Sequence, residues 1–351
     1  MLSNRPWSAD RIATLRTFCD ERSFDVSWYP GMDPVAARDS IYNDLPAVSF
    51  ASGETSADGP DDSIADEAPA VLADAATPSR SAFNLAPITL DRPFFNAVLR
   101  LDQLDTILKR LEILPQAEIS ALVNLAVLAQ AVVFAVLVLL VPLAAPRRLR
   151  MPEIGLLRPI VYFPALGLGF LFIEIFMIEQ ASQWLNDRTS GFAVVLTGML
   201  VFSGLGSMLA DRLTAAPRRA IALACLVAVG WCGAMLVGLQ PIKLATLGLP
   251  WIVRASLVLA VLAPVSLALG FPFPLGLART GSGGLLPWAW GLNGAFSVVA
   301  TPLATLIARE AGFSRVLLSA AVLYVIALVT FPATRKSRAW QKISVRSRAA
   351  E

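Results

Sequence analysis

Apolar residues are distributed unevenly along the chain: seven runs of about 20 residues follow residue 118, and no such run precedes it. A helix of about 20 residues crosses the hydrocarbon core of a bilayer, which is roughly 30 Å thick. The runs lie near 120–144, 159–181, 191–210, 219–240, 250–271, 287–308 and 313–331. Because backbone amides find no water at that depth, only helices are expected to span it. We therefore predict an all-α polytopic membrane bundle of about seven transmembrane helices.

The N-terminal third follows a different pattern. A helix is expected at 9–21 and an extended segment at 24–29, so residues 1–50 are interpreted as the end of an α/β, Rossmann-like domain. Residues 51–82 are rich in Gly, Ser, Pro and acidic residues, which predicts a disordered acidic insertion. Residues 83–118 place apolar positions at helical spacing opposite charged ones. They are expected to form an amphipathic juxtamembrane segment, which lies on the membrane or packs on the preceding domain.

Charge is divided between these two parts. Residues 1–118 hold 10 basic and 19 acidic residues, whereas residues 119–351 hold 19 basic and 7 acidic ones. In the membrane domain, 119–332, the basic residues concentrate in the loops after the first and third runs and continue into the tail, 333–351. The alternate loops are poorer in charge, and Lys243 is placed in one of them. By the positive-inside rule we expect a multi-pass inner-membrane protein with a cytoplasmic C-terminus.

This orientation places residues 1–118 on the far side without a signal sequence. We expect either a further part of the protein upstream, whose helices handle insertion, or a first span that inserts differently from the positive-inside rule. The partner that the composition predicts is the lipid bilayer, since 56% of residues are hydrophobic and 16% charged. We expect no nucleic-acid partner.

Several kinds of chemistry are excluded by the residue inventory. The chain has three cysteines and no histidine, so a His-dependent triad, a His-containing zinc site and a histidine proton shuttle are impossible within it. Cys225 and Cys232 lie seven residues apart on one face of an apolar run and are interpreted as small buried hydrophobic residues. We expect no metal site.

Polar residues within the apolar runs are the candidate site. Glu174 has two interpretations, proton or cation coupling and a structural hydrogen bond from a neutral carboxylic acid. Glu179 and Gln180, one turn further on, are expected near the interface. In the sixth run Asn293, Ser297, Thr301 and Thr305 follow one another at four-residue spacing. This polar stripe either lines a cavity or joins helices by hydrogen bonds.

A helix break is predicted after the fifth run. Pro272, Pro274 and Gly276 fall within seven residues that we expect not to continue as a regular helix. A broken or re-entrant segment of this kind often marks a transport site, although a simple loop explains the same residues.

Four stretches of the membrane domain carry a family resemblance. They are Leu166-Gly167-Leu168-Gly169-Phe170 (with Glu174 and Gln180), Ser203–Ser207, Phe273-Pro274-Leu275-Gly276 and Pro287–Gly294. In this order and spacing the chain resembles the membrane region of bacterial spermidine-synthase-like integral membrane proteins. Upstream, Tyr29-Pro30-Gly31, Tyr42-Asn43 and Asp91-Arg92-Pro93-Phe94-Phe95 resemble the segment that joins the family's aminopropyltransferase-like or methyltransferase-like domain to its membrane part.

The resemblance implies an S-adenosyl cofactor on a glycine-rich turn between a strand and a helix. No Gly-x-Gly pattern follows an expected strand here, and Gly204-x-Gly206 lies inside an apolar run. The chain therefore resembles the family's C-terminal half without its catalytic pocket, and we expect neither a cofactor nor a catalytic residue in it.

Three functional hypotheses follow. The first is a non-catalytic membrane domain that anchors, or cooperates with, a spermidine-synthase-like domain that is separately encoded or lost. A polyamine or other cationic substrate would suit Glu174. The second is a transporter-like protein for a small cationic or polar solute, which uses Glu174, Asn293 and the break near Pro272–Pro274. Seven spans are few for a two-repeat transporter, so it would need to form a homo-oligomer or find a partner. The third is a truncated gene product without activity.

Overall fold

The computed structural model describes residues 6–24, 26, 28–33, 88–95, 116–144, 157–213, 216–280 and 285–332. They belong to two units, one of residues 1–88 with 94–121 and one of residues 89–93 with 122–351. The acidic insertion predicted at 51–82 and the basic tail predicted at 333–351 lie outside the described residues, as does most of the amphipathic segment predicted at 83–118.

The first unit contains the helix expected after Ser8. It is α1 (Ala9–Glu21), and the Ser8 hydroxyl accepts a hydrogen bond from the Arg11 N–H at 3.4 Å, as an N-cap residue does. The strand expected at 24–29 is absent from the described part of that segment. An extended segment needs a neighbouring strand to pair its N–H and C=O groups, and the described residues provide none. No residue of α1 is buried.

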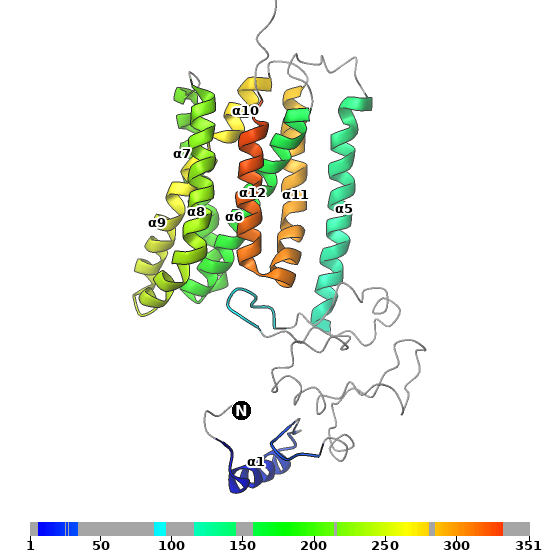
Figure 1. Ribbon diagram of the computed structural model, residues 1–351, viewed down its shortest axis with the longest axis vertical. Coiled ribbons are helices and arrows are strands. Elements are labelled where there is room, and N and C mark those ends of the chain that lie inside the picture. Colours follow the sequence, from blue (N-terminus) through cyan, green and yellow to red (C-terminus); the bar gives the residue numbers. More distant parts are fainter. Residues whose placement is uncertain are drawn as a thin grey trace, which may run out of the picture. The chain divides into compact units, whose positions relative to one another are not determined.

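The second unit is the predicted membrane bundle (Figure 1). Its helices are α5 (Gln116–Ala144), α6 (Leu157–Leu185), α7 (Arg188–Ala210), α8 (Pro217–Thr246), α9 (Trp251–Leu269), α10 (Pro272–Thr280), α11 (Leu285–Ala311) and α12 (Phe313–Thr330), with a 3₁₀ turn η3 (Asp211–Leu213) after α7. Within the described residues, seven segments are long and apolar enough to cross a membrane, the fifth being α9 together with α10. Most of these helices extend beyond the apolar runs that predicted them. Consecutive spans alternate in direction (Figure 1).

Helix α6 is the central element of the bundle. It packs along α11, α12, α7 and α9. In its apolar membrane-spanning stretch 67% of the residues are buried, against 11% in that of α5. Small residues permit the closest approaches, because a Cβ added at Gly169 would lie 3.0 Å from the Tyr324 ring on α12. Helix α5 is peripheral and contacts the bundle through Ala131 and Ala135, which pack with Val299 of α11.

The fifth span is interrupted between α9 and α10. Helix α9 ends at Leu269 and α10 begins at Pro272, so the break is at Gly270–Phe271. Pro272, Pro274 and Gly276, which the sequence placed in the break itself, lie inside α10. This position suits the two prolines, because the N–H groups of a first helical turn have no intrahelical partner to lose. The interruption is confirmed, but the expectation that these residues are non-helical is wrong.

Candidate functional site

A cavity of about 410 Å³ lies next to the break in the fifth span. Its walls come from six helices, with Gly167 and Phe170 on α6 and Asn293 and Ser297 on α11. Gly270, at the break, closes another side. The predicted helix break and the first half of the predicted polar stripe thus meet at one site.

The close approach of α6 and α11 forms one wall of this cavity. A Cβ added at Gly167 would lie 2.5 Å from the Asn293 carbonyl oxygen and 3.0 Å from Ser297 Oγ. The Asn293 side chain donates from Nδ2 to the Phe163 carbonyl of α6 at 3.2 Å. Its carboxamide oxygen accepts no hydrogen bond from a described residue. Asn293 therefore joins two helices and still presents an acceptor.

The walls of the cavity are uncharged. None of its fourteen lining residues is Asp, Glu, Lys or Arg. Ser203 and Ser207 of α7 add hydroxyl groups, and Phe273 and Tyr324 add aromatic rings. Such a site suits a molecule with a few hydrogen-bonding groups on an apolar body.

Glu174 does not line this cavity. Its side chain is buried, with 8% exposure, one turn beyond Phe170 on the same face of α6. Its carboxyl group makes no hydrogen bond or ion pair with a described residue. Thr301 does not line the cavity either: it is exposed on α11, and its carbonyl accepts a bond from the Thr305 hydroxyl at 3.0 Å.

Lys243 belongs to a second polar cluster, near the C-terminal end of α6. The sequence placed it in a loop, but α8 continues through Pro241 to Thr246, and the Lys243 side chain is buried. Its Nζ donates to Gln180 Oε1 at 2.7 Å and to Gln183 Oε1 at 2.8 Å. An ammonium group this deeply buried requires such acceptors. Arg254 of α9 also holds this end of α6, since its Nη1 donates to the Trp184 carbonyl at 2.6 Å.

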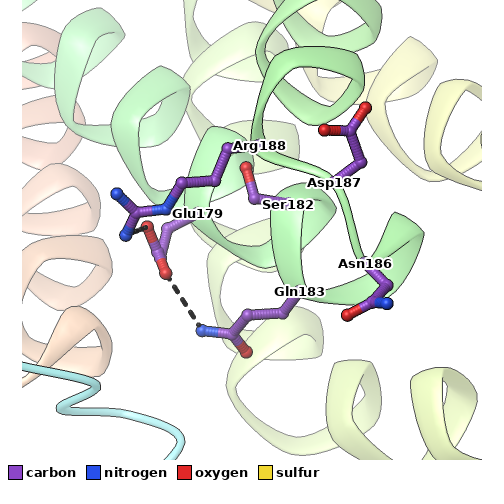
Figure 2. A pocket seen from close by; sticks show the side chains of 6 residues that line it. All are labelled: Glu179, Ser182, Gln183, Asn186, Asp187 and Arg188. Atoms are coloured by element: carbon purple, nitrogen blue, oxygen red, sulfur yellow. Dashed lines mark hydrogen bonds and ion pairs between the residues drawn. The ribbon is translucent and has the colours of Figure 1, made fainter.

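A small cleft adjoins this cluster at the turn between α6 and α7 (Figure 2). The Arg188 guanidinium lies beside Glu179, at 4.0 Å, and Gln183 Nε2 donates to Glu179 Oε1 at 3.3 Å. Asp187 points away from this group in Figure 2. It accepts instead from the N–H groups of Thr189 and Ser190 at 3.2 and 3.0 Å, which caps α7.

Asp187 is exposed and lies outside the membrane-spanning segments. Its hydrogen bond from the Ser190 hydroxyl, followed by the bonds from the Ser190 and Thr189 N–H groups, lowers the pKa of the carboxyl from its ordinary value of 3.8. The contacts of this cleft are capping bonds and an ion pair, and they are typical of a structural helix turn.

The segment 89–93 is hydrogen-bonded to the end of the bundle at which α6 ends and α12 begins. Asp91 Oδ1 accepts from the Ser314 N–H and from its hydroxyl, each at 2.8 Å, and the Asp91 carbonyl accepts from the Phe313 N–H at 3.0 Å. Gly312 precedes α12 with φ +93°, a conformation that favours glycine. Asp91 therefore caps α12 from a distant part of the sequence.

The structure sorts the candidate residues into separate groups. Asn293, Ser297 and Pro274 line the cavity, whereas Glu179 and Gln180 belong to the Lys243 cluster. Pro272 and Gly276 contact Tyr162, whose hydroxyl donates to the Pro272 carbonyl at 2.6 Å. No sequence pattern indicated the roles of Tyr324 and Lys243, because each depends on contacts between distant helices.

Comparisons of the chain with models of protein families, with curated proteins and with solved structures gave no match. The structure itself relates the four stretches of the family resemblance to the cavity. Nine of the fourteen cavity-lining residues fall in the four stretches on which the family resemblance depends. These stretches are far apart in the sequence and meet at one site.

Proposed function

We propose that this chain is a transporter-like membrane protein that binds a small polar solute in the cavity beside the break between α9 and α10. The observation that carries the proposal is the meeting of an interrupted helix, the Asn293 carboxamide and the Ser297 hydroxyl at one site. Broken helices that line a cavity are the usual place for a solute site in transporters. A volume of about 410 Å³ is within the range of small-molecule pockets.

The test compares two glycine substitutions in the full chain. Gly204 lines the cavity, Gly233 lies on an outer face of α8, both are exposed, and a Cβ added at either meets no atom within 4 Å. Because a side chain at Gly204 begins in open space, Gly204→Trp is expected to place an indole at the cavity, and Gly233→Trp is its matched control. Thermal unfolding in lipid nanodiscs would be measured with spermidine, glycerol, benzyl alcohol and benzoate.

We expect at least one of these solutes to raise the unfolding midpoint of the unsubstituted protein and of Gly233→Trp, but not that of Gly204→Trp. The stabilising solute should then show saturable flux into vesicles that contain the protein. If no solute stabilises the protein, or if Gly204→Trp responds equally, the cavity is not a binding site.

A second function is proposed from the family resemblance: the bundle anchors, or cooperates with, an S-adenosyl-dependent domain that this chain does not contain. The attachment of segment 89–93 supports it. Asp91–Phe95 is one of the stretches that resemble the family's joining segment, and Asp91 is hydrogen-bonded to the start of α12. Such a contact would hold the membrane end of an attached domain in a fixed position.

The anchoring function is tested by the neighbouring reading frames and by ligand binding. A Rossmann-type domain encoded next to this chain should co-purify with it from detergent-solubilised membranes. The purified chain alone should show no saturable binding of S-adenosylmethionine. Saturable binding by the chain alone, or a neighbouring domain that does not co-purify, would contradict the proposal.

A further inference from the structure

Exposed residues flank the cavity on α7 and on α11. Both helices pack along α6, and the lining residues Leu200 and Gly204 are exposed on α7. Across the opening, Gly294 and Val298 are exposed on α11, and Leu200 and Val298 are each 61% exposed. The floor is α6, whose Gly167 is buried and whose Phe170 is partly exposed. The mouth of the cavity is therefore on the lateral surface of the bundle.

The lateral surface at this depth faces hydrocarbon. At 1.5 Å per residue, Gly204 lies about 9 Å, Asn293 about 12 Å and Leu200 about 15 Å from the ends of their helices on the same side of the bundle. A hydrocarbon core about 30 Å thick has leaflets of about 15 Å. The opening thus lies within one leaflet, where the surrounding solvent is lipid.

The chemistry of the walls agrees with this location. A charged solute would lose its hydration in the cavity and find no side chain of opposite charge, which makes its binding costly. Glu174 does not compensate, since it lies outside the lining. Hydroxyl and carboxamide groups are present, and the oxygen of Asn293 is available to accept a hydrogen bond. Aromatic rings of Phe273 and Tyr324 complete an apolar enclosure.

We propose that the cavity takes an uncharged, lipid-soluble molecule with a hydrogen-bonding end, such as an alcohol, and that this molecule enters from the bilayer between α7 and α11. The proposal rests on the proposed binding function and narrows its solute class. It excludes a polyamine as the occupant of this cavity. The proposal also gives Gly204 a role: because it has no side chain, it leaves the entrance of the cavity open.

The probe is a benzyl alcohol that carries a trifluoromethyl-diazirine, because it is neutral, enters lipid and labels nearby residues on illumination. The full chain is placed in vesicles of phosphatidylcholine and phosphatidylglycerol, and labelled residues are identified by mass spectrometry. The benzylammonium analogue, also carrying a diazirine, is the charged comparison, and the phenyl diazirine without a hydroxyl group is the apolar one. Excess unlabelled benzyl alcohol distinguishes saturable labelling from general labelling of lipid-facing surfaces.

We expect saturable labelling of α11 around Asn293 by the alcohol, about tenfold above that by the ammonium analogue, because the walls offer no counter-charge. Gly204→Trp should reduce this labelling about tenfold, since an indole at the mouth blocks access, and Gly233→Trp should leave it unchanged. Asn293→Leu should reduce labelling by the alcohol about fivefold and leave that by the hydroxyl-free probe unchanged, because only the alcohol loses a hydrogen bond. The last comparison does not depend on the tolerance of a tryptophan at Gly204.

Two results overturn the proposal and are distinguishable. If the ammonium analogue labels the cavity saturably and the alcohol does not, the solute is charged and the lipid route is wrong, but the binding function stands. If no probe labels the cavity saturably, both the lipid route and the binding function are wrong.

Discussion

The crossing of α6 and α11 at Gly167 gives the sharpest test of the packing described above. In Gly167→Ala the new methyl carbon would lie 2.5 Å from the Asn293 carbonyl oxygen, a backbone atom that no rotamer change can move. Carbon and oxygen atoms in contact are about 3.3 Å apart or more. The two helices must therefore separate by about 0.8 Å at this crossing, a distance that follows from the same contact limit. Overpacking of this kind typically costs about 1–3 kcal/mol.

The assay is thermal unfolding of the full chain in one detergent, with Gly204→Ala as the matched control. A Cβ at Gly204 meets no atom within 4 Å, and alanine is the better helix former. We expect the midpoint of Gly167→Ala to fall by about 5 °C, as a loss of about 2 kcal/mol implies for a domain of this size. Gly204→Ala should unfold at the unsubstituted midpoint or slightly above it. Equal midpoints for the two variants would refute the packing argument.

Three further predictions concern the opposite end of the bundle. Asp91→Ala should lower the free energy of unfolding by about 1–2 kcal/mol, because α12 loses its cap; detergent unfolding titrations would show no change if the cap were unimportant. Gln180→Leu should cost about 2–3 kcal/mol by removing an acceptor from the buried Lys243 ammonium. The double variant with Lys243→Met should recover most of that loss, and a cycle with additive effects would contradict the coupling. Because the pKa of Asp187 is lowered in the folded protein, its stabilisation is complete above pH 3.8 and is lost as the pH falls through the lower folded value. The acid unfolding profile of Asp187→Asn should therefore lack the loss of stability that protonation of Asp187 causes. If Asp187→Asn and the unsubstituted protein have identical acid unfolding profiles, Asp187 does not contribute to acid stability.

The spans themselves were predictable from the sequence, because lipid imposes a length and a composition that any apolar run must meet. Their ends were less so. Helix α8 was expected to stop before Pro241, yet it continues to Thr246. A proline inside a helix removes one backbone hydrogen bond. In this chain the continuation of α8 also places the Lys243 ammonium within hydrogen-bond distance of Gln180 and Gln183. These two hydrogen bonds depend on the position of α8 beside α6, which the sequence does not show.

The sequence predicted the four-residue spacing of the polar residues on α11, but only part of this stripe lines the cavity. Successive positions four residues apart turn about 40° around a helix. Asn293 and Ser297 stay within one cavity wall, whereas Thr301 has turned about 80° from Asn293 and faces outward. The sequence could supply this angle but not the position of α6, and without α6 the inward part of the stripe could not be defined. Tyr324 had no sequence signal at all, since its place in the wall depends on the packing of α12.

The separation of charged and uncharged polar groups along α6 has one physical cause. Gln180 and Gln183 hold the Lys243 ammonium near the end of the helix, where the adjoining cleft brings in Glu179 and Arg188. Charges at that level have hydrogen-bond or ion-pair partners, which offset the cost of their desolvation. Deeper in the bundle the same cost rises, and the cavity beside Gly167 is built without charge. Glu174 lies between these two levels, makes no hydrogen bond with a described residue and lies outside the cavity lining. The cavity walls therefore offer a cation no counter-charge, and this favours an uncharged occupant.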